Sequence, residues 1–334
     1  MFIFKFCSRL FLVSIIISCF LMSFQGGKQP HVVFIAGEPE YGAHWSLPKI
    51  ADDLQERFNI KSTVIHSWRG GVDDYDIPGR VIPEYSDIPN LEIINEADLI
   101  VLFIRFRIPR PEQFEILQKY FDSGKPAIAF RTTSHAFWHE ERKGWFVPFF
   151  GGHYKTHLGN AAGTTSMVPS EQLSHPILRG VPKSEYLGYG GVYLTQPLND
   201  TATPLMFGKT GNDPAQPLTW INEYKKGQKI FYTGLGSLEN FLNEGFLNMV
   251  YNTIYWCLDR DIPENGVLGL EQTMETEWKY GKERSSEPKK IPGEAYRSPE
   301  IPKPPKTKIP KNAKVLFDGS DFSNWRHWDL STDP

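Results

Sequence analysis

The stretch Asp98-Leu-Ile-Val-Leu-Phe-Ile104 is the strongest β-strand signal in the sequence. A helix is predicted over Pro111–Asp122, because proline favours the first helical turn and large apolar residues then recur on one face. A second short apolar stretch, Pro126–Phe130, predicts another strand. Short apolar strands that alternate with amphipathic helices are typical of a parallel sheet covered on both faces.

The same alternation extends towards the N-terminus. Strands are predicted over His31–Ala36 and Lys61–His66, with a helix between them whose apolar residues run from Leu47 to Phe58 at helical spacing. We therefore expect a doubly wound α/β fold. The second half adds a closing helix, Phe246–Leu258, and further strands that extend or flank the sheet: Thr164–Val168, Gly190–Leu194, Pro204–Gly208, Leu218–Glu223 and Lys229–Gly234.

The two ends of the sequence differ from this α/β domain, which we place at residues 31–262. Residues 1–25 carry basic residues before an apolar run, the pattern of a secretory signal, so we expect an exported protein, periplasmic or extracellular. In an alternative interpretation the segment is a lipoprotein signal, and Cys19 becomes the lipidated first residue of the mature chain. We expect contact with a membrane only in that case. Residues 263–312 are rich in Pro, Lys and Glu and predict a linker. Residues 313–334 read as the start of a truncated second domain.

Composition excludes some classes of protein. A formal net charge of −3 gives no excess of positive charge for nucleic acid. Cys7 and Cys19 lie in the signal segment, which leaves Cys257, too few for a disulfide framework or a thiolate metal site. Aromatic residues make up 14% of the chain, which suits either sugar stacking or ordinary packing. Trp45, Trp138, Trp145, Tyr154 and Tyr189 are the candidates for sugar-stacking rings.

Polar residues gather where the predicted strands end, and the carboxyl ends of parallel strands meet at one edge of a sheet. We therefore expect a site there. Its substrate-binding candidates are Glu38, His44, Trp45, Arg105, Ser134, Tyr154 and His157, and its catalytic candidates are Arg131, His135 and His153.

Two kinds of chemistry remain open for these residues. His153 and His157 are spaced i, i+4 and would share one face of a helical turn, so with a third ligand they could hold a zinc-type divalent ion. The alternative is that the imidazoles bond sugar hydroxyls or backbone groups. Glu38, Glu40 and Glu141 are candidate general acids or bases. Ser134 and His135 do not form the Gly-x-Ser-x-Gly pattern of a nucleophile elbow, and neighbouring side chains usually project apart.

Several segments together resemble the ThuA-like trehalose-utilisation family. They are Gly37-Glu-Pro-Glu-Tyr-Gly-Ala-His44, Phe130-Arg-Thr-Thr-Ser-His-Ala-Phe137, Phe150-Gly-Gly-His-Tyr-Lys-Thr-His157, His175-Pro-Ile-Leu-Arg-Gly180, Lys229-Ile-Phe-Tyr-Thr-Gly-Leu-Gly236 and Asn252-Thr-Ile-Tyr-Trp256. The resemblance implies the flavodoxin-like core of class I glutamine amidotransferases. Those enzymes carry a nucleophilic Cys after the strand that ends here at Phe130, where this chain has Thr132 to His135, so amidotransferase chemistry is not expected. Many ThuA-like proteins also have His at the position of Ser237.

The tail resembles a different family. Val315-Leu-Phe-Asp-Gly-Ser-Asp-Phe-Ser-Asn-Trp325 is similar to the opening of a 3-keto-disaccharide hydrolase domain. Together the two resemblances imply an exported carbohydrate-utilisation protein that binds and transforms a disaccharide or 3-keto-glycoside. His135 or His153 would act as acid or base, and Arg131 would bind substrate oxygens. The alternatives are a non-catalytic sugar-binding module that serves the following hydrolase domain, and a metal-dependent hydrolase.

Overall fold

The computed structural model describes residues 28–38, 40–67, 86–137, 142 and 144–269. All of them lie in the first of the chain's two units, Met1–Ser285. The expected signal segment with Cys19, Trp138, Glu141, most of the expected linker and the tail at 313–334 lie outside the described residues. Within the described part, no helix is both long and apolar enough to span a membrane.

The main sheet of the described part has nine strands, in the order β2-β1-β3-β4-β11-β10-β9-β6-β7. Its first strands in that order, from β2 to β11, run parallel, and the remaining strands pair antiparallel. The parallel strands are β2 (Lys61–His66), β1 (His31–Gly37), β3 (Leu99–Ile104), β4 (Ala127–Phe130) and β11 (Ile230–Thr233). The antiparallel flank consists of β10 (Gln216–Asn222), β9 (Thr203–Lys209), β6 (Thr165–Met167) and β7 (Ser184–Tyr186).

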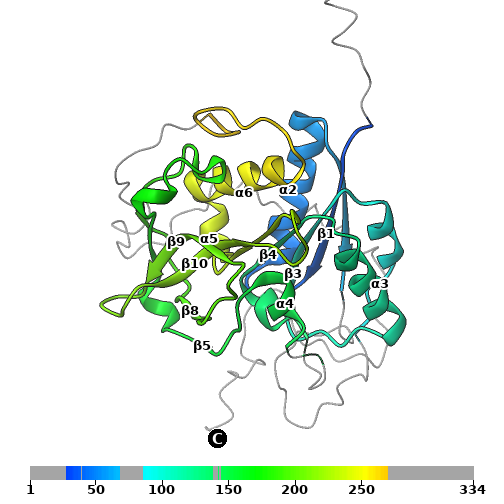
Figure 1. The fold of residues 1–334 in the computed structure, drawn as a ribbon, viewed down its shortest axis with the longest axis horizontal. Helices are drawn as coiled ribbons and strands as arrows, with labels where there is room; N and C mark the ends of the chain where they lie inside the picture. Colours follow the sequence, from blue (N-terminus) through cyan, green and yellow to red (C-terminus); the bar gives the residue numbers. More distant parts are fainter. Residues whose placement is uncertain (1–27, 39, 68–85, 138–141, 143, 270–334) are drawn as a thin grey trace, which may run out of the picture. The chain divides into compact units, whose positions relative to one another are not determined.

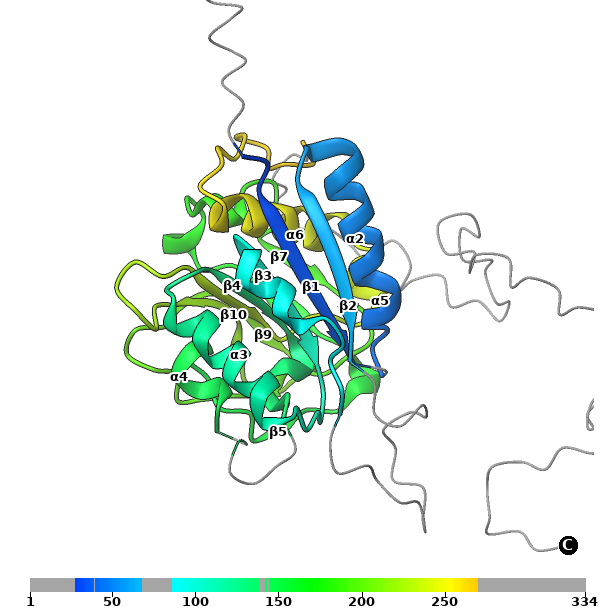
Figure 2. The ribbon, with the colours of Figure 1, turned by 90° about the vertical axis from the view of Figure 1, so that its right-hand side faces the viewer.

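Helices cover both faces of the parallel strands (Figures 1 and 2). Helices α2 (Ala43–Phe58), α5 (Leu238–Phe241) and α6 (Glu244–Cys257) contribute to one apolar core, and α3 (Pro111–Asp122) and α4 (Phe146–Phe150) contribute to the other. Successive residues of a strand point to opposite faces. In β1, Val32 and Phe34 accordingly enter the first core, whereas Val33 and Ile35 enter the second. Burial of each such side chain stabilises the fold by about 1.5–3 kcal/mol.

The fold prediction is confirmed, including the bounds of β2 and α3. One predicted strand, Gly190–Leu194, is shorter than expected. Only Tyr193–Leu194 forms a strand, β8, and it pairs with β5 (Thr156–His157) in a separate small sheet. The reason is local, because Gly190 has a φ of 109° and breaks the extended backbone. Short 3₁₀ helices fill the connections: η1 (Leu91–Glu96), η2 (Arg131–His135), η4 (Asn160–Ala162), η5 (Ser170–Gln172) and η6 (Pro176–Leu178).

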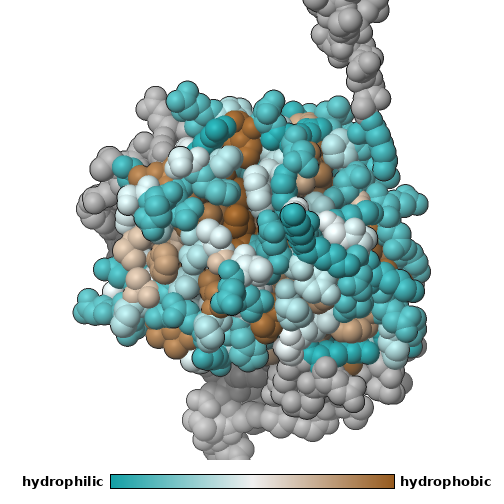
Figure 3. All heavy atoms as spheres, in the orientation of Figure 1, coloured by the Kyte–Doolittle hydropathy of each residue, from teal (hydrophilic) through white to brown (hydrophobic). Residues whose placement is uncertain are grey.

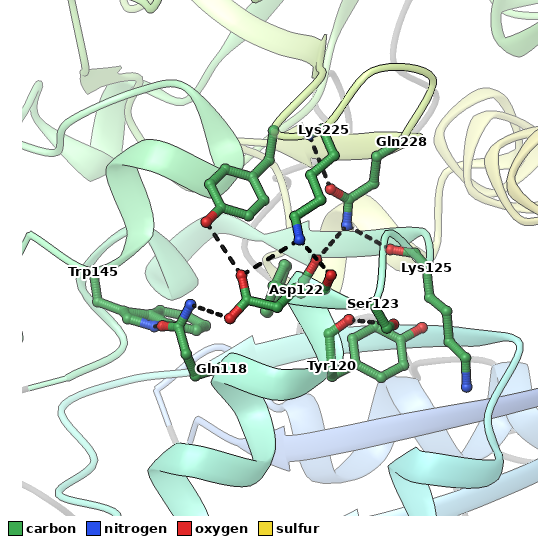
Figure 4. Close-up of polar contacts among 10 residues, drawn as sticks. Gln118, Tyr120, Asp122, Ser123, Lys125, Trp145, Lys225 and Gln228 are labelled. Atoms are coloured by element: carbon green, nitrogen blue, oxygen red, sulfur yellow. Dashed lines mark hydrogen bonds and ion pairs between the residues drawn. The ribbon is translucent and has the colours of Figure 1, made fainter.

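A polar cluster fastens the β10–β11 hairpin to the end of α3 (Figure 4). The Asp122 carboxylate accepts a hydrogen bond from the Tyr224 hydroxyl at 3.3 Å, and the Lys225 ammonium donates to the Asp122 carbonyl. Gln228 Nε2 donates to the carbonyl of Phe121 at 3.2 Å. Carbonyls at the end of a helix lack helical partners. The hairpin supplies partners for the carbonyls of Phe121 and Asp122, at the amino ends of β4 and β11.

Candidate functional site

Several chain segments converge at the carboxyl ends of the parallel strands. The turn after β1 carries Glu38, Glu40 and Tyr41, Arg105 follows β3, and η2 follows β4 directly. The loop that leads into β5 adds Tyr154 and ends near β8. Ligands of open α/β sheets bind at this edge. These candidate residues therefore lie at the edge of the sheet where the sequence predicted them, and binding of a ligand there stays a prediction.

Arg131 is the buried centre of this region. It has a φ of 36°, so a non-glycine residue adopts the left-handed conformation immediately after β4. Its guanidinium donates to the carbonyls of Gly234 at 2.8 Å and Gly191 at 3.3 Å. It also donates to the Tyr41 hydroxyl and to Asn160 Oδ1, both at 3.3 Å. One side chain thus connects segments that are far apart in the sequence.

Aromatic rings enclose the same guanidinium. Its carbon lies 4.3 Å from the centre of the Tyr41 ring and 4.5 Å from that of Tyr193. The side chain is only 1% exposed, and no carboxylate among the described residues forms an ion pair with it. Carbonyl oxygens and π faces therefore supply the compensation that a buried cation requires. The assignment of Arg131 to substrate oxygens stays a prediction.

A series of side-chain contacts joins His135 to Tyr154 and Tyr154 to His157. The rings of His135 and Tyr154 are 4.2 Å apart, and the Tyr154 hydroxyl lies 3.1 Å from Nδ1 of His157. Burial, reinforced by the charges of Arg105 and Arg131, lowers the pKa of His135 to about 3. This imidazole is therefore neutral at pH 7 and suits hydrogen bonding better than proton donation. Its acid or base role stays a prediction.

Ser134 lies closer to His135 than we expected. Ser134 Oγ is 3.2 Å from Nδ1 of His135, although neighbouring side chains were expected to project apart. The 3₁₀ turn η2 explains the contact, because it folds the serine back so that Oγ also donates to the Arg131 carbonyl at 3.1 Å. That hydroxyl is 4% exposed and holds the turn together.

Glu38 and Glu40 occupy opposite environments. Both carboxylate oxygens of Glu38 accept from the backbone N–H of Tyr41, at 2.9 and 2.8 Å, and the residue is 3% exposed. Burial raises the pKa of Glu38 to about 7, against the opposing effect of these backbone bonds. Glu40 Oε2 lies 3.2 Å from Nε of Arg105, and the Glu40 side chain is 26% exposed. Glu38 therefore stabilises the turn from inside, whereas the Glu40 side chain is partly exposed to solvent.

Exposed rings lie beside this region. Trp45 and Tyr189 are 41% and 44% exposed. Trp45 lies in the first turn of α2 next to His44, with ring centres 5.2 Å apart, and Tyr189 precedes Gly190, which lies against the Arg131 guanidinium. On the face shown in Figure 3, hydrophobic residues form separate areas among hydrophilic ones. Trp145 differs from these rings, because it packs against the second core.

The proposed metal pair is not arranged as the sequence suggested. Thr156–His157 is an extended strand, so His153 and His157 do not share a helical face. His153 is exposed, and its backbone N–H donates to the carbonyl of Thr195 at 3.2 Å. No group of three or more His, Cys, Asp or Glu side chains in the described ranges could hold a metal ion. A metal at His153 and His157 stays a prediction.

Sequence reasoning left out three residues that the structure brings to the site. Tyr41 and Tyr193 enclose Arg131, and Asn160 bonds both Arg131 and Tyr41. Tyr41 lies in the Gly37–Gly42 loop, so its position was a usable signal. Tyr193 and Asn160 are distant in sequence from their partners, and no local pattern indicates their role.

The family model described as trehalose utilisation (ThuA) matches residues 86–257. Two solved structures of proteins described as ThuA-like are similar to this chain. The one from Bacteroides uniformis has a TM-score of 0.51 and 15% identity, and the alignment covers 70% of this chain and 94% of that one. The one from Parabacteroides merdae has a TM-score of 0.52 and 12% identity, with coverage of 74% and 96%.

At these identities the structures show a shared fold alone, and that fold agrees with the amidotransferase-like expectation. No protein of curated function matches the sequence. The family model spans about half of the chain and includes η2, Tyr154 and β11. The chain therefore belongs to the ThuA family.

Proposed function

We propose that this chain is an exported carbohydrate-utilisation protein and that the carboxyl-end region binds a disaccharide or 3-keto-glycoside. One observation carries the proposal: the segments that meet at the carboxyl ends carry two exposed rings, Trp45 and Tyr189, and also carry hydrogen-bonding groups that are at least partly accessible, Glu40, Tyr154 and His157. The family description, trehalose utilisation, supports the same class of ligand.

The chemistry of sugars matches these groups. A pyranose ring presents an apolar C–H face that packs on an aromatic ring, and its hydroxyls both donate and accept hydrogen bonds. Carboxylate, phenol and imidazole groups provide both kinds of partner. A site of this kind binds its ligand through oriented polar groups with aromatic walls.

Transformation of the sugar is the finer part of the proposal. A group that exchanges protons near neutral pH is required, and the pKa of about 7 for Glu38 meets this requirement although the residue is buried. The pKa of about 3 for His135 meets it less well. A binding module without catalysis remains the alternative, and a turnover assay separates the two.

The test is calorimetric titration of the full-length chain with trehalose and with 3-keto-trehalose, each with and without chelator. We expect both Trp45→Ala and Tyr189→Ala to weaken binding at least tenfold, because each removes a stacking face. Leu242→Ala is the control, since Leu242 is 42% exposed and is not one of the proposed site residues. Absence of binding to the wild-type chain, or equal binding by all variants, would refute the proposal. Loss of binding with chelator would instead support the metal-dependent alternative.

Export is a separate part of the proposal and rests on residues 1–25. Cell fractionation of the full-length chain and of a variant without these residues tests it. We expect only the full-length chain to leave the cytoplasm, and equal distribution of the two would contradict export by this segment.

A further inference from the structure

The charged side chains of the candidate site differ in how far they are exposed to solvent. The Arg131 guanidinium is 1% exposed, and the Arg105 side chain is 15% exposed and paired with Glu40. The Glu40 side chain is 26% exposed. Arg105 and Arg131 are also the cations that act on the pKa of Tyr154 and of His135. Of these three charged side chains, the Glu40 carboxylate is therefore the most exposed.

Tyr41 connects Arg131 to the turn that carries Glu40. The Tyr41 oxygen accepts hydrogen bonds from Arg131 at 3.3 Å and from Asn160 Nδ2 at 3.4 Å. Burial raises the pKa of Tyr41, and the charge of Glu40 adds to this rise. Arg131 thus holds Tyr41, while Arg105 forms an ion pair with the neighbouring Glu40.

The ion pair with Arg105 takes up only part of the hydrogen-bonding capacity of the Glu40 carboxylate. A carboxylate can accept about four hydrogen bonds through its two oxygens. Arg105 lies against one of these oxygens, with Nε 3.2 Å from Oε2. The remaining capacity suits two neighbouring hydroxyl groups of one ligand, because a vicinal diol presents two donors at the spacing of the two carboxylate oxygens.

We propose that Glu40 determines the specificity of this site, accepting hydrogen bonds from a vicinal diol of an uncharged sugar and excluding sugar acids and sugar phosphates. The inference rests on the proposed function and narrows its ligand class. An anionic sugar would place like charges together, because Arg131 is only 1% exposed and Arg105 is already paired with Glu40. Like-charge contacts of this kind are an effective means of rejecting a ligand.

The experiment compares Glu40→Gln with Glu115→Gln in the full-length chain. Glu115 is an exposed glutamate on α3, outside the site, and controls for loss of one surface charge. Each protein is titrated with trehalose, 3-keto-trehalose and trehalose 6-phosphate, after urea unfolding has shown that the variants fold. We expect Glu40→Gln to weaken binding of the uncharged sugars at least tenfold and Glu115→Gln to leave it unchanged. The wild-type chain should bind the phosphate at least tenfold more weakly than trehalose, and Glu40→Gln should narrow that difference.

The possible outcomes distinguish failure of this inference from failure of the proposed function. If the wild-type chain binds the uncharged sugars and Glu40→Gln binds them equally well, this inference is wrong and the proposed function stands. Equal binding of trehalose and its phosphate by the wild-type chain would also overturn the inference alone. If the wild-type chain binds neither uncharged sugar, the proposed function fails, and the inference fails with it.

Discussion

The buried hydroxyl of Tyr232 donates a 2.8 Å hydrogen bond to the carbonyl oxygen of Arg131. The contact joins β11 to the first residue after β4, the residue that has a φ of 36°. A left-handed conformation costs a non-glycine residue about 1–2 kcal/mol. The neighbouring strand therefore helps to hold the strained turn from which the Arg131 side chain reaches its carbonyl and tyrosine partners.

We expect Tyr232→Phe to lower the free energy of unfolding by about 1–2 kcal/mol, because it removes one donor from a buried carbonyl. The loss stays at this level because Ser134 Oγ still donates to the same oxygen at 3.1 Å. Urea unfolding measures it. Tyr189→Phe is the control, since Tyr189 is 44% exposed and should show no loss. Equal stability of wild type and Tyr232→Phe would falsify the bracing role.

Arg131→Lys should be more damaging. Lysine keeps the charge but has a single nitrogen, which cannot reach Gly191, Gly234, Tyr41 and Asn160 together as the guanidinium does. We expect the free energy of unfolding to fall by at least about 2 kcal/mol, the effect of leaving several buried acceptors unpaired. The same urea titration measures it. If Arg131→Lys unfolds at the wild-type urea concentration, the guanidinium is not the structural centre described above.

The sequence predicted the fold well because the relevant signals are local. Alternating apolar strands and helices indicate a doubly wound sheet, and a proline at the first turn and Gly124 after the last turn define α3. Strands of two or three residues, such as β5 and β7, have too few positions to show a period. They are determined by pairing with distant strands, which the sequence does not show.

The site was predicted less completely, and Glu38 and Glu40 show why. The two glutamates are two residues apart in one turn, and the sequence made both of them candidate general acids or bases. Their difference arises because the Tyr41 backbone N–H captures Glu38 inside the turn, whereas Arg105 holds Glu40 at the surface. The sequence shows the residue types of a turn but not which carboxylate its backbone binds.

His153 and His157 should differ in their effect on binding. His157 is hydrogen-bonded to Tyr154, whereas the contacts of this group do not include His153. We expect His157→Ala to weaken binding of trehalose or 3-keto-trehalose about tenfold, with His153→Ala near wild type. Calorimetry measures the affinities, and elemental analysis of both purified variants accompanies it. Equal losses of affinity, together with metal present in the wild type and absent from both variants, would establish a shared metal site instead.

The raised pKa of Glu38 predicts how the free energy of unfolding depends on pH. Its pKa is raised from 4.5 to about 7, chiefly by burial, so the folded chain binds this proton more tightly than the unfolded chain. The stabilisation is fully present below about pH 4.5 and is lost as the pH rises through 7, when ionisation costs the folded state about 3 kcal/mol. Glu38→Gln does not ionise. Its free energy of unfolding should therefore increase relative to wild type between pH 4.5 and 8.5.

The comparison with Glu38→Gln also removes the effects of other groups. His135 has its pKa lowered from 6.5 to about 3, so its contribution is lost as the pH falls below 6.5, the opposite direction to that of Glu38. This contribution is common to both proteins and cancels in their difference. Urea unfolding at several pH values gives that difference directly. A constant difference across the range would show that Glu38 titrates equally in the folded and unfolded chains, and a difference of opposite slope would show that its backbone hydrogen bonds outweigh its burial.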